Sequence, residues 1–553
     1  MTLKKFREEC ESVVGGHAKL LVTPPKEINA DLALPCFSLS KELKKAPQEI
    51  AASLAKEFLK KKLTLIKEIR AEGPYVNFYA DWSRLSKEII AESSGKDYGK
   101  GADKRKIIVE FAHPNTHKLF HIGHLRNVTT GESVARILER AGAKVIRANY
   151  QGDVGLHIAK CLWGIGKEDV KKIKELDEKI RFLGKAYAKG SKAYEEDEKA
   201  KKEITEINGK IYAKDAKIMK LWQETRQWSL DYFARIYSRV YTKYDRFYFE
   251  SEVAQKGLEI ARQALKKGIL KESEGAVIFD GEAHSLDKRV FINSLGFPMY
   301  EAKELGLAEL EFGEFGAIDK CIHVVGPEQA SFFKVTFKVE ELIDKKYKGK
   351  QFHLAYGWVK LREGKMSSRL GNVIEGEWLL EELKKSILEN YVAKEDHDEK
   401  VKEEIAEAGA IGAAKYYFLK YGTASEISFD IKEAASLEGD TGPYLQYTHA
   451  RAASVLRKAK KKPKAGGLSG KETGLARKLA EFPAAAERAA AELKPNVVAN
   501  YVFELASMFN AYYHEEKIIG SDNEVEKLAL VAAAKNVIGI SLNLLGIKPL
   551  EKM

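Results

Sequence analysis

One strand–helix–strand stretch constrains the fold of this chain more than any other feature. Residues 107–111 form a short run rich in β-branched side chains, which is typical of a buried strand. A helical pattern follows, and its apolar positions are Val134, Ile137, Leu138 and Ala141. Gly142 stands where a helix C-cap is expected, and residues 144–148 form a second apolar run. Two strands joined by a helix are the building block of a parallel sheet, so the chain is predicted to be an α/β protein.

The turn between the first strand and the helix carries the candidate chemistry. It contains the consecutive residues His121, Ile122, Gly123 and His124. Ligands of open α/β sheets bind at the carboxyl ends of strands, and a helix N-terminus there offers free N–H groups to a phosphate. Gly123 leaves room for a nucleotide, and the two imidazoles can hydrogen-bond a phosphoryl oxygen. The alternative is a pair of surface histidines, and four residues alone do not decide between the two.

A second motif lies far downstream, where Gly364–Arg369 (GKMSSR) follows the apolar run of residues 352–361. HIGH followed by a KMSKS-like loop resembles the class I aminoacyl-tRNA synthetases. Further segments are similar to the arginyl members of that class. They are Glu110–Phe111, Pro114–Asn115, Lys118, His124–Arg126, Gly439–Tyr447 and Leu545–Met553. The similarity extends over nearly the whole chain.

The resemblance implies a class I Rossmann-like parallel-sheet catalytic domain with helical insertions, a small α+β N-terminal domain and an all-α C-terminal bundle. The N-terminal domain is predicted over residues 1–100 and the catalytic domain over 105–375, with its helical insertion at about 155–250. A connecting segment, 376–435, leads to an anticodon-binding domain over 436–553. By resemblance, the N-terminal domain is expected to contact the elbow of the tRNA. The alternative is a domain that packs against the rest of the chain and does not contact tRNA.

Local patterns support this division. Strands are predicted at residues 31–34 and 75–79 and a helix at 50–59, with a linker over 93–105. An apolar stripe in the insertion is interpreted as core, and its members are Trp222, Trp228, Tyr232, Phe233, Ile236 and Tyr237. Another helical face consists of Val502, Leu505, Phe509 and Tyr512. Residues 457–474 are predicted to form a basic flexible loop, which either meets phosphates or is simply solvated.

Composition limits the partners and the compartment. The net charge of +12 and the pI of about 9.0 suggest an anionic partner, although solubility alone is an alternative. Four scattered cysteines fit neither a disulfide framework nor a zinc ribbon and favour a reducing, cytoplasmic setting; they are Cys10, Cys36, Cys161 and Cys321. The N-terminus lacks the apolar core of a signal peptide. The apolar stretch 528–547 contains Lys535 and Asn536, so a packed helix is expected there and no membrane span.

The resemblance implies an enzyme that joins L-arginine to tRNA-Arg through an arginyl-adenylate, consuming ATP and releasing AMP and pyrophosphate. Mg²⁺ is expected with the ATP, no protein site for a metal is visible, and a monomer is expected. A class I synthetase for cysteine, glutamate or lysine is an alternative, but zinc-ligand cysteines are missing and Asp440–Tyr447 would be unexplained. A tRNA-binding paralogue without catalysis is another, against which the intact His121, His124 and Lys365 argue.

The catalytic residues implied by the resemblance are His121 and His124 at the α-phosphate and Lys365 at the pyrophosphate. Ser368 replaces the second lysine of KMSKS and cannot supply its charge, so Lys118 is the expected substitute. The alternative for Lys118 is a solvated turn residue. The full expected ATP site is Lys118, His121, Gly123, His124, Lys365, Met366, Ser367, Ser368 and Arg369.

A guanidinium is best recognised by carboxylate and amide oxygens. The arginine-binding residues implied by the resemblance are Glu110, Asn115, Asn149, Asp153, Tyr300, Glu304 and Gln329. Glu110 and Asn115 are assigned to the α-amino and carboxyl ends of arginine, and Asn149 and Asp153 are expected to line the same pocket. Tyr300, Glu304 and Gln329 are assigned to the guanidinium; the family commonly has Asp where this chain has Glu304. An ordinary surface pair of Tyr300 and Glu304 is the alternative.

Overall fold

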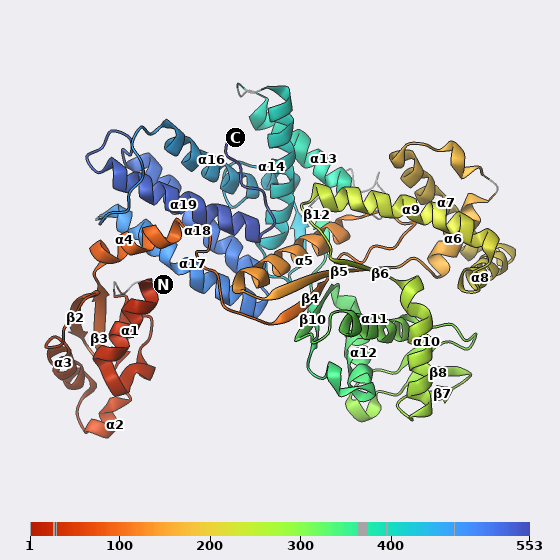
Figure 1. The fold of residues 1–553 in the computed structure, drawn as a ribbon, viewed down its shortest axis with the longest axis horizontal. Helices are drawn as coiled ribbons and strands as arrows, with labels where there is room; N and C mark the ends of the chain where they lie inside the picture. Colours follow the sequence, from red (N-terminus) through yellow and green to blue (C-terminus); the bar gives the residue numbers. More distant parts are fainter. Residues whose placement is uncertain are drawn as a thin grey trace.

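The computed structural model describes residues 2–25, 28, 30–166, 168–362, 374–393, 396, 398–468 and 470–553. Figure 1 shows a central sheet with the N-terminal domain at one end of the molecule and a helical insertion at the other. The C-terminal helices lie over the sheet on the side of the N-terminal domain.

The central sheet has five parallel strands in the order β11-β10-β4-β5-β6. Their bounds are β4 Lys106–Glu110, β5 Lys144–Gln151, β6 Arg246–Phe249, β10 Lys320–Val325 and β11 Gln351–Ala355. The predicted class, an α/β protein with a parallel sheet, is therefore confirmed. The predicted strand–helix–strand unit is β4, α5 (Ile122–Ala141) and β5.

Helix α5 is buried along most of its length. A Cβ on Gly131 would lie 2.2 Å from Cγ of Phe111, so the helix approaches the end of β4 closely. Gly142 ends the helix with φ of 103°, which agrees with the predicted C-cap. The C-terminal helices cover the opposite side of α5 (Figure 1).

The N-terminal domain is an antiparallel sheet with helices packed against it. Its elements are α1 Thr2–Val14, β1 Leu32–Pro35, α2 Leu39–Leu43, α3 Pro47–Phe58, β2 Ile66–Glu72, β3 Tyr75–Ala80 and α4 Trp82–Ser93. The strand order is β1-β3-β2. The predicted strands and helix are present, but α1 and β2 were not predicted. In the segment 94–105, the Tyr98 hydroxyl donates to the Leu479 carbonyl at 2.9 Å, so the linker is tied to the C-terminal helices.

Between β5 and β6 lies the helical insertion, which consists of α6 Leu156–Ile165, α7 Leu176–Glu196, α8 Glu198–Tyr212 and α9 Ala216–Arg239. The predicted apolar stripe on α9 is buried, as expected of core. A second insertion separates β6 from β10. Its elements are α10 Glu250–Lys266, β7 Lys271–Ser273, β8 Ala276–Phe279, β9 Arg289–Ile292 and α11 Tyr300–Glu314. Helix α12 Ala330–Ile343 then connects β10 to β11.

The rest of the chain is mostly helical. Its elements are β12 Val359–Leu361, α13 Gly376–Ile387, α14 Glu399–Leu419, β13 Ile427–Phe429, α15 Ile431–Ala434, α16 Gly442–Lys458, α17 Lys471–Glu492, α18 Pro495–Glu515 and α19 Glu524–Leu544. The predicted apolar face on α18 is buried. The basic segment before α17 is held at two points, because the Lys464 N–H donates to Val525 and the Leu468 N–H donates to Ser86. Among the described residues, no helix has the length and hydropathy needed to span a membrane.

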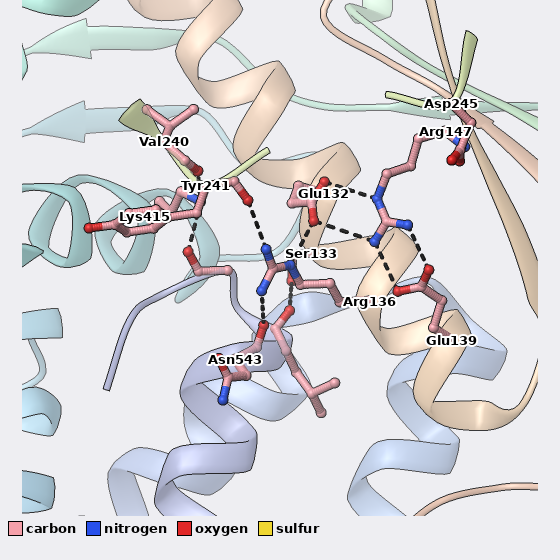
Figure 2. Close-up of polar contacts among 12 residues, drawn as sticks. Glu132, Ser133, Arg136, Glu139, Arg147, Val240, Tyr241, Asp245, Lys415 and Asn543 are labelled. Carbon is pink, nitrogen blue, oxygen red and sulfur yellow. Dashed lines mark hydrogen bonds and ion pairs between the residues drawn. The ribbon is translucent and has the colours of Figure 1, made fainter. Parts of the chain in front are cut away.

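A buried polar network joins α5 to the neighbouring elements (Figure 2). The Glu132 carboxylate accepts from Arg136 Nε at 2.7 Å and from Arg147 Nε at 3.1 Å, and Arg147 also pairs with Glu139 at 2.6 Å. Arg136 donates to the carbonyls of Asn543 and Tyr241. One carboxylate on α5 thus aligns two arginines, one of which reaches α19.

Lys415 on α14 connects the same elements (Figure 2). Its ammonium group donates to the Val240 carbonyl at 2.5 Å and to the Gly546 carbonyl at 2.7 Å. The Ser133 hydroxyl donates to the Leu544 carbonyl at 2.9 Å. The end of α19, the end of α9 and the middle of α5 are therefore held together by polar contacts at one place.

Glu132→Ala should destabilise the chain strongly, because it leaves the guanidinium of Arg147 buried with one of its two carboxylate partners removed. Loss of one partner of a buried ion pair costs about 3–5 kcal/mol. The midpoint of urea unfolding should fall accordingly. Glu196→Ala removes the exposed pair with Lys192 and is the control, with an expected change below about 1 kcal/mol. Equal midpoints for the two variants would contradict the structural role of Glu132.

Candidate active site

A cavity of about 680 Å³ opens at the carboxyl ends of β4, β5 and β10. It collects residues from both sequence-predicted sites. Those that line it are Glu110, Asn115, His121, Gly123, His124, Tyr300, Glu304 and Gln329. The cavity therefore lies at the sheet edge where ligands of open α/β sheets bind.

His121 and His124 form the start of α5 together. The Gly123 N–H donates to His121 Nδ1 at 3.1 Å, and the His121 N–H donates to His124 Nδ1 at 3.2 Å. The two rings stack with centroids 3.7 Å apart. Because each Nδ1 accepts a hydrogen bond, the proton of each neutral ring is assigned to Nε2. Both histidines therefore offer an Nε2–H donor.

The two imidazoles are uncharged near neutral pH. Burial, with a contribution from the positive charge of Lys118, lowers the pKa of His121 to about 4. Burial and the neighbouring His121 lower the pKa of His124 well below its usual value. A phosphate here would meet two neutral hydrogen-bond donors beside a helix N-terminus.

The turn that precedes the histidines has an unusual backbone. Ala112, His113 and His117 have φ of 85°, 49° and 63°, a region that non-glycine residues rarely adopt. Such conformations cost about 1–3 kcal/mol each. The surrounding structure must therefore hold the turn in place.

Hydrogen bonds from other elements stabilise this turn. The Ala112 N–H donates to Asn127 Oδ1 at 2.6 Å, and Asn127 Nδ2 donates to the Val324 carbonyl at 2.7 Å. The His117 N–H donates to the Ser229 hydroxyl at 2.9 Å. The strained turn is thus attached to α5, β10 and α9.

Two buried carboxylates lie at the other end of the cavity. Glu110 and Glu304 are 2% and 4% exposed, and each has one oxygen without a hydrogen-bond partner among the described residues. Burial raises the pKa of Glu304 to about 8, an effect that the nearby His323 partly opposes and that Glu110 increases. The Tyr150 hydroxyl, which also faces the cavity, likewise lacks a partner among these residues.

Asn149 and Asp153 are not among the described residues that line the cavity. The Asp153 carboxylate accepts from Arg226 Nε at 2.8 Å and from the Ser251 hydroxyl at 2.7 Å. Asn149 Nδ2 donates to the Tyr237 hydroxyl at 3.0 Å. Contrary to the expectation that they line the pocket, Asn149 connects β5 to α9, and Asp153 connects the turn after β5 to α9 and α10.

Lys118 lies beside the cavity and does not line it. Its Nζ is 5.0 Å from the centre of the Tyr187 ring on α7. The other expected ATP-site residues, Lys365, Met366, Ser367, Ser368 and Arg369, lie outside the described residues. The residues on either side of that stretch do border the cavity, which Val359 and Ile374 line.

Several cavity residues were not predicted from the sequence. They are His113, Asn127, Tyr150, Glu250, Tyr356 and Trp358, and His323 lies directly behind the cavity. Glu250 begins α10 and pairs with Lys303 at 2.7 Å. His113 could have been predicted, because it follows the predicted strand 107–111 by two residues. The other residues belong to no recognisable sequence motif.

Comparison with known proteins identifies the family. Family models match three parts of the chain: "Arginyl tRNA synthetase N terminal domain" at residues 3–80, "tRNA synthetases class I (R), catalytic domain" at 87–431 and "DALR anticodon binding domain" at 445–553. An arginine–tRNA ligase of Bdellovibrio bacteriovorus is 32% identical over 558 residues, covering 97% of this chain and 94% of the relative. The chain belongs to the arginyl-tRNA synthetase family.

Other members of the family agree along the whole length. The arginine–tRNA ligase of Clostridium perfringens is 32% identical over 576 residues and covers 100% of this chain and 99% of its own. The solved Thermus thermophilus arginyl-tRNA synthetase superposes with a TM-score of 0.80 at 27% identity, covering 99% of this chain and 100% of that structure. The Plasmodium falciparum arginyl-tRNA synthetase, at 19% identity and a TM-score of 0.78 over 100% of this chain and 99% of its own, shares the fold.

Proposed function

We propose that this arginyl-tRNA synthetase binds ATP at the His121–His124 end of the cavity and the arginine side chain at Glu110 and Glu304. The chain attaches L-arginine to tRNA-Arg in two steps. The arginine carboxylate attacks the α-phosphorus of ATP, which forms the arginyl-adenylate and releases pyrophosphate. A ribose hydroxyl at the 3′ end of the tRNA then loses its proton and attacks the adenylate carbonyl, which releases AMP.

At the phosphate end, the proposed roles follow from the two Nε2–H donors. Negative charge grows on the α-phosphate oxygens during attack, and fixed hydrogen-bond donors stabilise that charge without reorganising. The backbone hydrogen bonds to Nδ1 hold both rings in place. Lys365 is proposed to approach the pyrophosphate, and Mg²⁺ to arrive bound to the ATP phosphates; no residue of this chain is assigned to the ion.

At the arginine end, one observation carries the proposal. Two buried carboxylates line one cavity, and Glu110 Oε2 has no hydrogen-bond partner among the described residues, which is costly unless a ligand supplies a donor. Glu304 Oε1 accepts no hydrogen bond from these residues and lies 3.8 Å from His323 Nδ1. A guanidinium supplies up to five N–H donors and a permanent positive charge. Glu110 is therefore assigned to the guanidinium together with Glu304, in place of its earlier assignment to the α-amino end. Tyr300 and Gln329 remain proposed partners of the arginine side chain, and Asn115 of its α-amino and carboxyl groups.

The C-terminal bundle offers a candidate pocket for anticodon nucleotides. A second cavity of about 770 Å³ is lined by Tyr447, Arg451, Arg457 and Tyr513 among others. The Arg451 guanidinium lies 4.7 Å from the Tyr447 ring centre and 5.1 Å from that of Tyr513. Aromatic rings and guanidinium planes are the surfaces on which unstacked RNA bases are recognised.

The two outer domains are proposed to hold the tRNA. The N-terminal domain, residues 1–100, is proposed to contact the tRNA elbow, and residues 436–553 to hold the anticodon loop. The four cysteines are unpaired and buried, which supports a cytoplasmic location. A monomer is proposed because the cavity is formed within one chain.

Lys118→Ala should raise KM for ATP or lower kcat by about 10-fold or more, since a charged hydrogen bond contributes about 1.5–3 kcal/mol. Lys118 is proposed to supply the positive charge that is missing because Ser368 replaces the second lysine of KMSKS. Combining Lys118→Ala with Ser368→Lys should recover part of the loss, as measured by steady-state kinetics at limiting ATP. Wild-type kinetics in Lys118→Ala would refute the compensation.

Glu304 should make arginine use depend on pH. Because the pKa of Glu304 is raised to about 8, its carboxyl is mostly protonated at pH 6 and must lose a proton to pair with a guanidinium. The kcat/KM for arginine should therefore rise up to about 10-fold per pH unit from pH 6 and level off near 8. The histidines of the phosphate end stay neutral over this range and add no slope.

Glu304→Gln should abolish this slope and raise KM for arginine about 10-fold or more. Glu309→Gln is the matched control on the same helix, because Glu309 pairs with Lys346 at 2.7 Å and does not line the cavity. A wild-type KM for arginine in Glu304→Gln would show that the guanidinium binds elsewhere.

Arg451→Ala should weaken tRNA binding about 10-fold, because stacking on one base contributes about 1–3 kcal/mol. Filter binding of labelled tRNA-Arg measures the effect directly. Arg488→Ala, on the exposed side of α17, removes the same charge without an aromatic neighbour in the second cavity. Equal losses in the two variants would indicate a general charge effect and exclude a base pocket at Arg451.

A further inference from the structure

A fully buried histidine lies behind the two carboxylates of the arginine site. His323 on β10 stands opposite Glu110 on β4 in the parallel register. Its Nδ1 is 3.0 Å from Glu110 Oε1 and 3.8 Å from Glu304 Oε1. One ring nitrogen thus faces carboxylate oxygens from two different elements.

The other ring nitrogen also faces an oxygen. His323 Nε2 is 3.0 Å from Gln351 Oε1, and Gln351 Nε2 donates to Glu340 Oε2 at 2.7 Å. Since the Gln351 amide uses its NH₂ group on Glu340, its oxygen can only accept from His323. An ionised carboxylate likewise only accepts. With Glu110 ionised, as its lowered pKa indicates, both nitrogens of His323 carry hydrogen and the ring is an imidazolium.

We propose that His323 is a buried imidazolium that positions Glu110 and Glu304 for the arginine guanidinium. This role rests on the arginine site proposed above. The cation keeps Glu110 ionised and fixes Glu110 Oε1, so that Oε2, which has no hydrogen-bond partner among the described residues, is left for the ligand. His323 lowers the pKa of both carboxyls. Without its charge, both would hold protons more tightly, and these protons would compete more strongly with the guanidinium.

The pKa directions agree with this arrangement. The neighbouring thiol and carboxylate groups raise the pKa of His323 well above its usual value in spite of burial, and His323 lowers the pKa of Glu110 against the effect of burial. The titratable groups that face His323 are Glu110 from β4, His113 from the following turn, Glu304 and Glu311 from α11, Cys321 from β10, Glu340 from α12 and His353 from β11.

A metal ion is the competing explanation for this cluster. Ligand atoms of Glu311, Cys321 and His323 lie within 4.8 Å of one another. A metal ligand must present a lone pair, however, and both nitrogens of His323 point at oxygens that accept hydrogen. The Cys321 thiol also donates, to Glu311 Oε2 at 3.5 Å. The hydrogen bonds therefore indicate that this cluster holds protons and not a metal ion.

Steady-state kinetics of His323→Gln over pH 6–9 tests the role, because glutamine keeps a hydrogen bond and removes the charge. KM for arginine at pH 7 should rise at least 10-fold, while kcat changes less than 3-fold and KM for ATP less than 2-fold. The midpoint of the pH profile of kcat/KM for arginine should move upward by at least one pH unit. A merely structural role would lower Tm and kcat and leave that midpoint in place.

Two further variants keep the test decisive. Gln351→Leu deletes the oxygen that accepts from His323 Nε2. It should raise KM for arginine and the midpoint of the pH profile, by a smaller factor than His323→Gln. This variant replaces His323→Gln as the test if His323→Gln does not fold. His353→Gln is the matched control on the neighbouring strand, where His353 Nε2 is 3.1 Å from the Val325 carbonyl and the ring does not line the cavity. Its KM for arginine should stay within 2-fold of wild type.

The outcomes separate the two proposals. If Glu304→Gln raises KM for arginine and folded His323→Gln does not, the role of His323 is wrong and the arginine site stands. If neither variant changes KM, the arginine site itself is wrong. Stoichiometric zinc in the purified chain, lost in Cys321→Ser, would also overturn the proposal, because a metal-bound nitrogen cannot donate to Glu110 or Gln351.

Discussion

The burial of α5 is the constraint on which the rest of the structure depends. A helix surrounded on all sides cannot shift without disturbing everything that packs on it. Its first residues carry the histidines of the cavity, and its middle carries Glu132 and Arg136, which are bonded to other elements. Arg126, also on α5, donates to the carbonyls of Gly357 and Ser425, and so holds the segment that leads into the second motif. One helix thereby sets the positions of the two histidines, the segment around Gly357 and the C-terminal bundle.

The titratable residues at the two ends of the cavity differ in their protonation: the two histidines are neutral, and Glu304 holds its proton more tightly than usual. At the start of α5, burial removes charge from His121 and His124, so that they can donate hydrogen bonds without taking up protons. At the other end of the cavity, burial and neighbouring carboxylates hold protons that a cation can displace. The same physical effect, desolvation, produces neutral donors from imidazoles and proton-holding acceptors from glutamates. A zwitterionic substrate with a cationic side chain fits such a division.

The sequence predicts those parts of the molecule whose signals are local. Strand β4, helix α5 and strand β5 follow from apolar spacing and one C-capping glycine. Strand β6 is not predicted because its four residues, Arg246–Phe249, are too few to show a period beside a long helical segment. Strand β2 is not predicted because charged side chains occupy four of its seven positions. Asp153 looked like a pocket residue because it follows a strand. Its partners Arg226 and Ser251 are distant in sequence, so no local pattern predicts that they occupy it. The role of His323 is not predicted either, because its partners Glu110 and Gln351 are also distant in sequence.

The left-handed turn at Ala112, His113 and His117 also bears on the order in which the protein is completed during synthesis. The residues that form the turn leave the ribosome early, but the Ser229 and Val324 groups that hold it are made much later. The helix behind it is in turn attached to the Leu544 carbonyl, because Ser133 donates to this group 411 residues further along the chain. The turn therefore has no stable shape of its own in the nascent chain, and the active site is a late product of folding although its motif is among the first parts to be made.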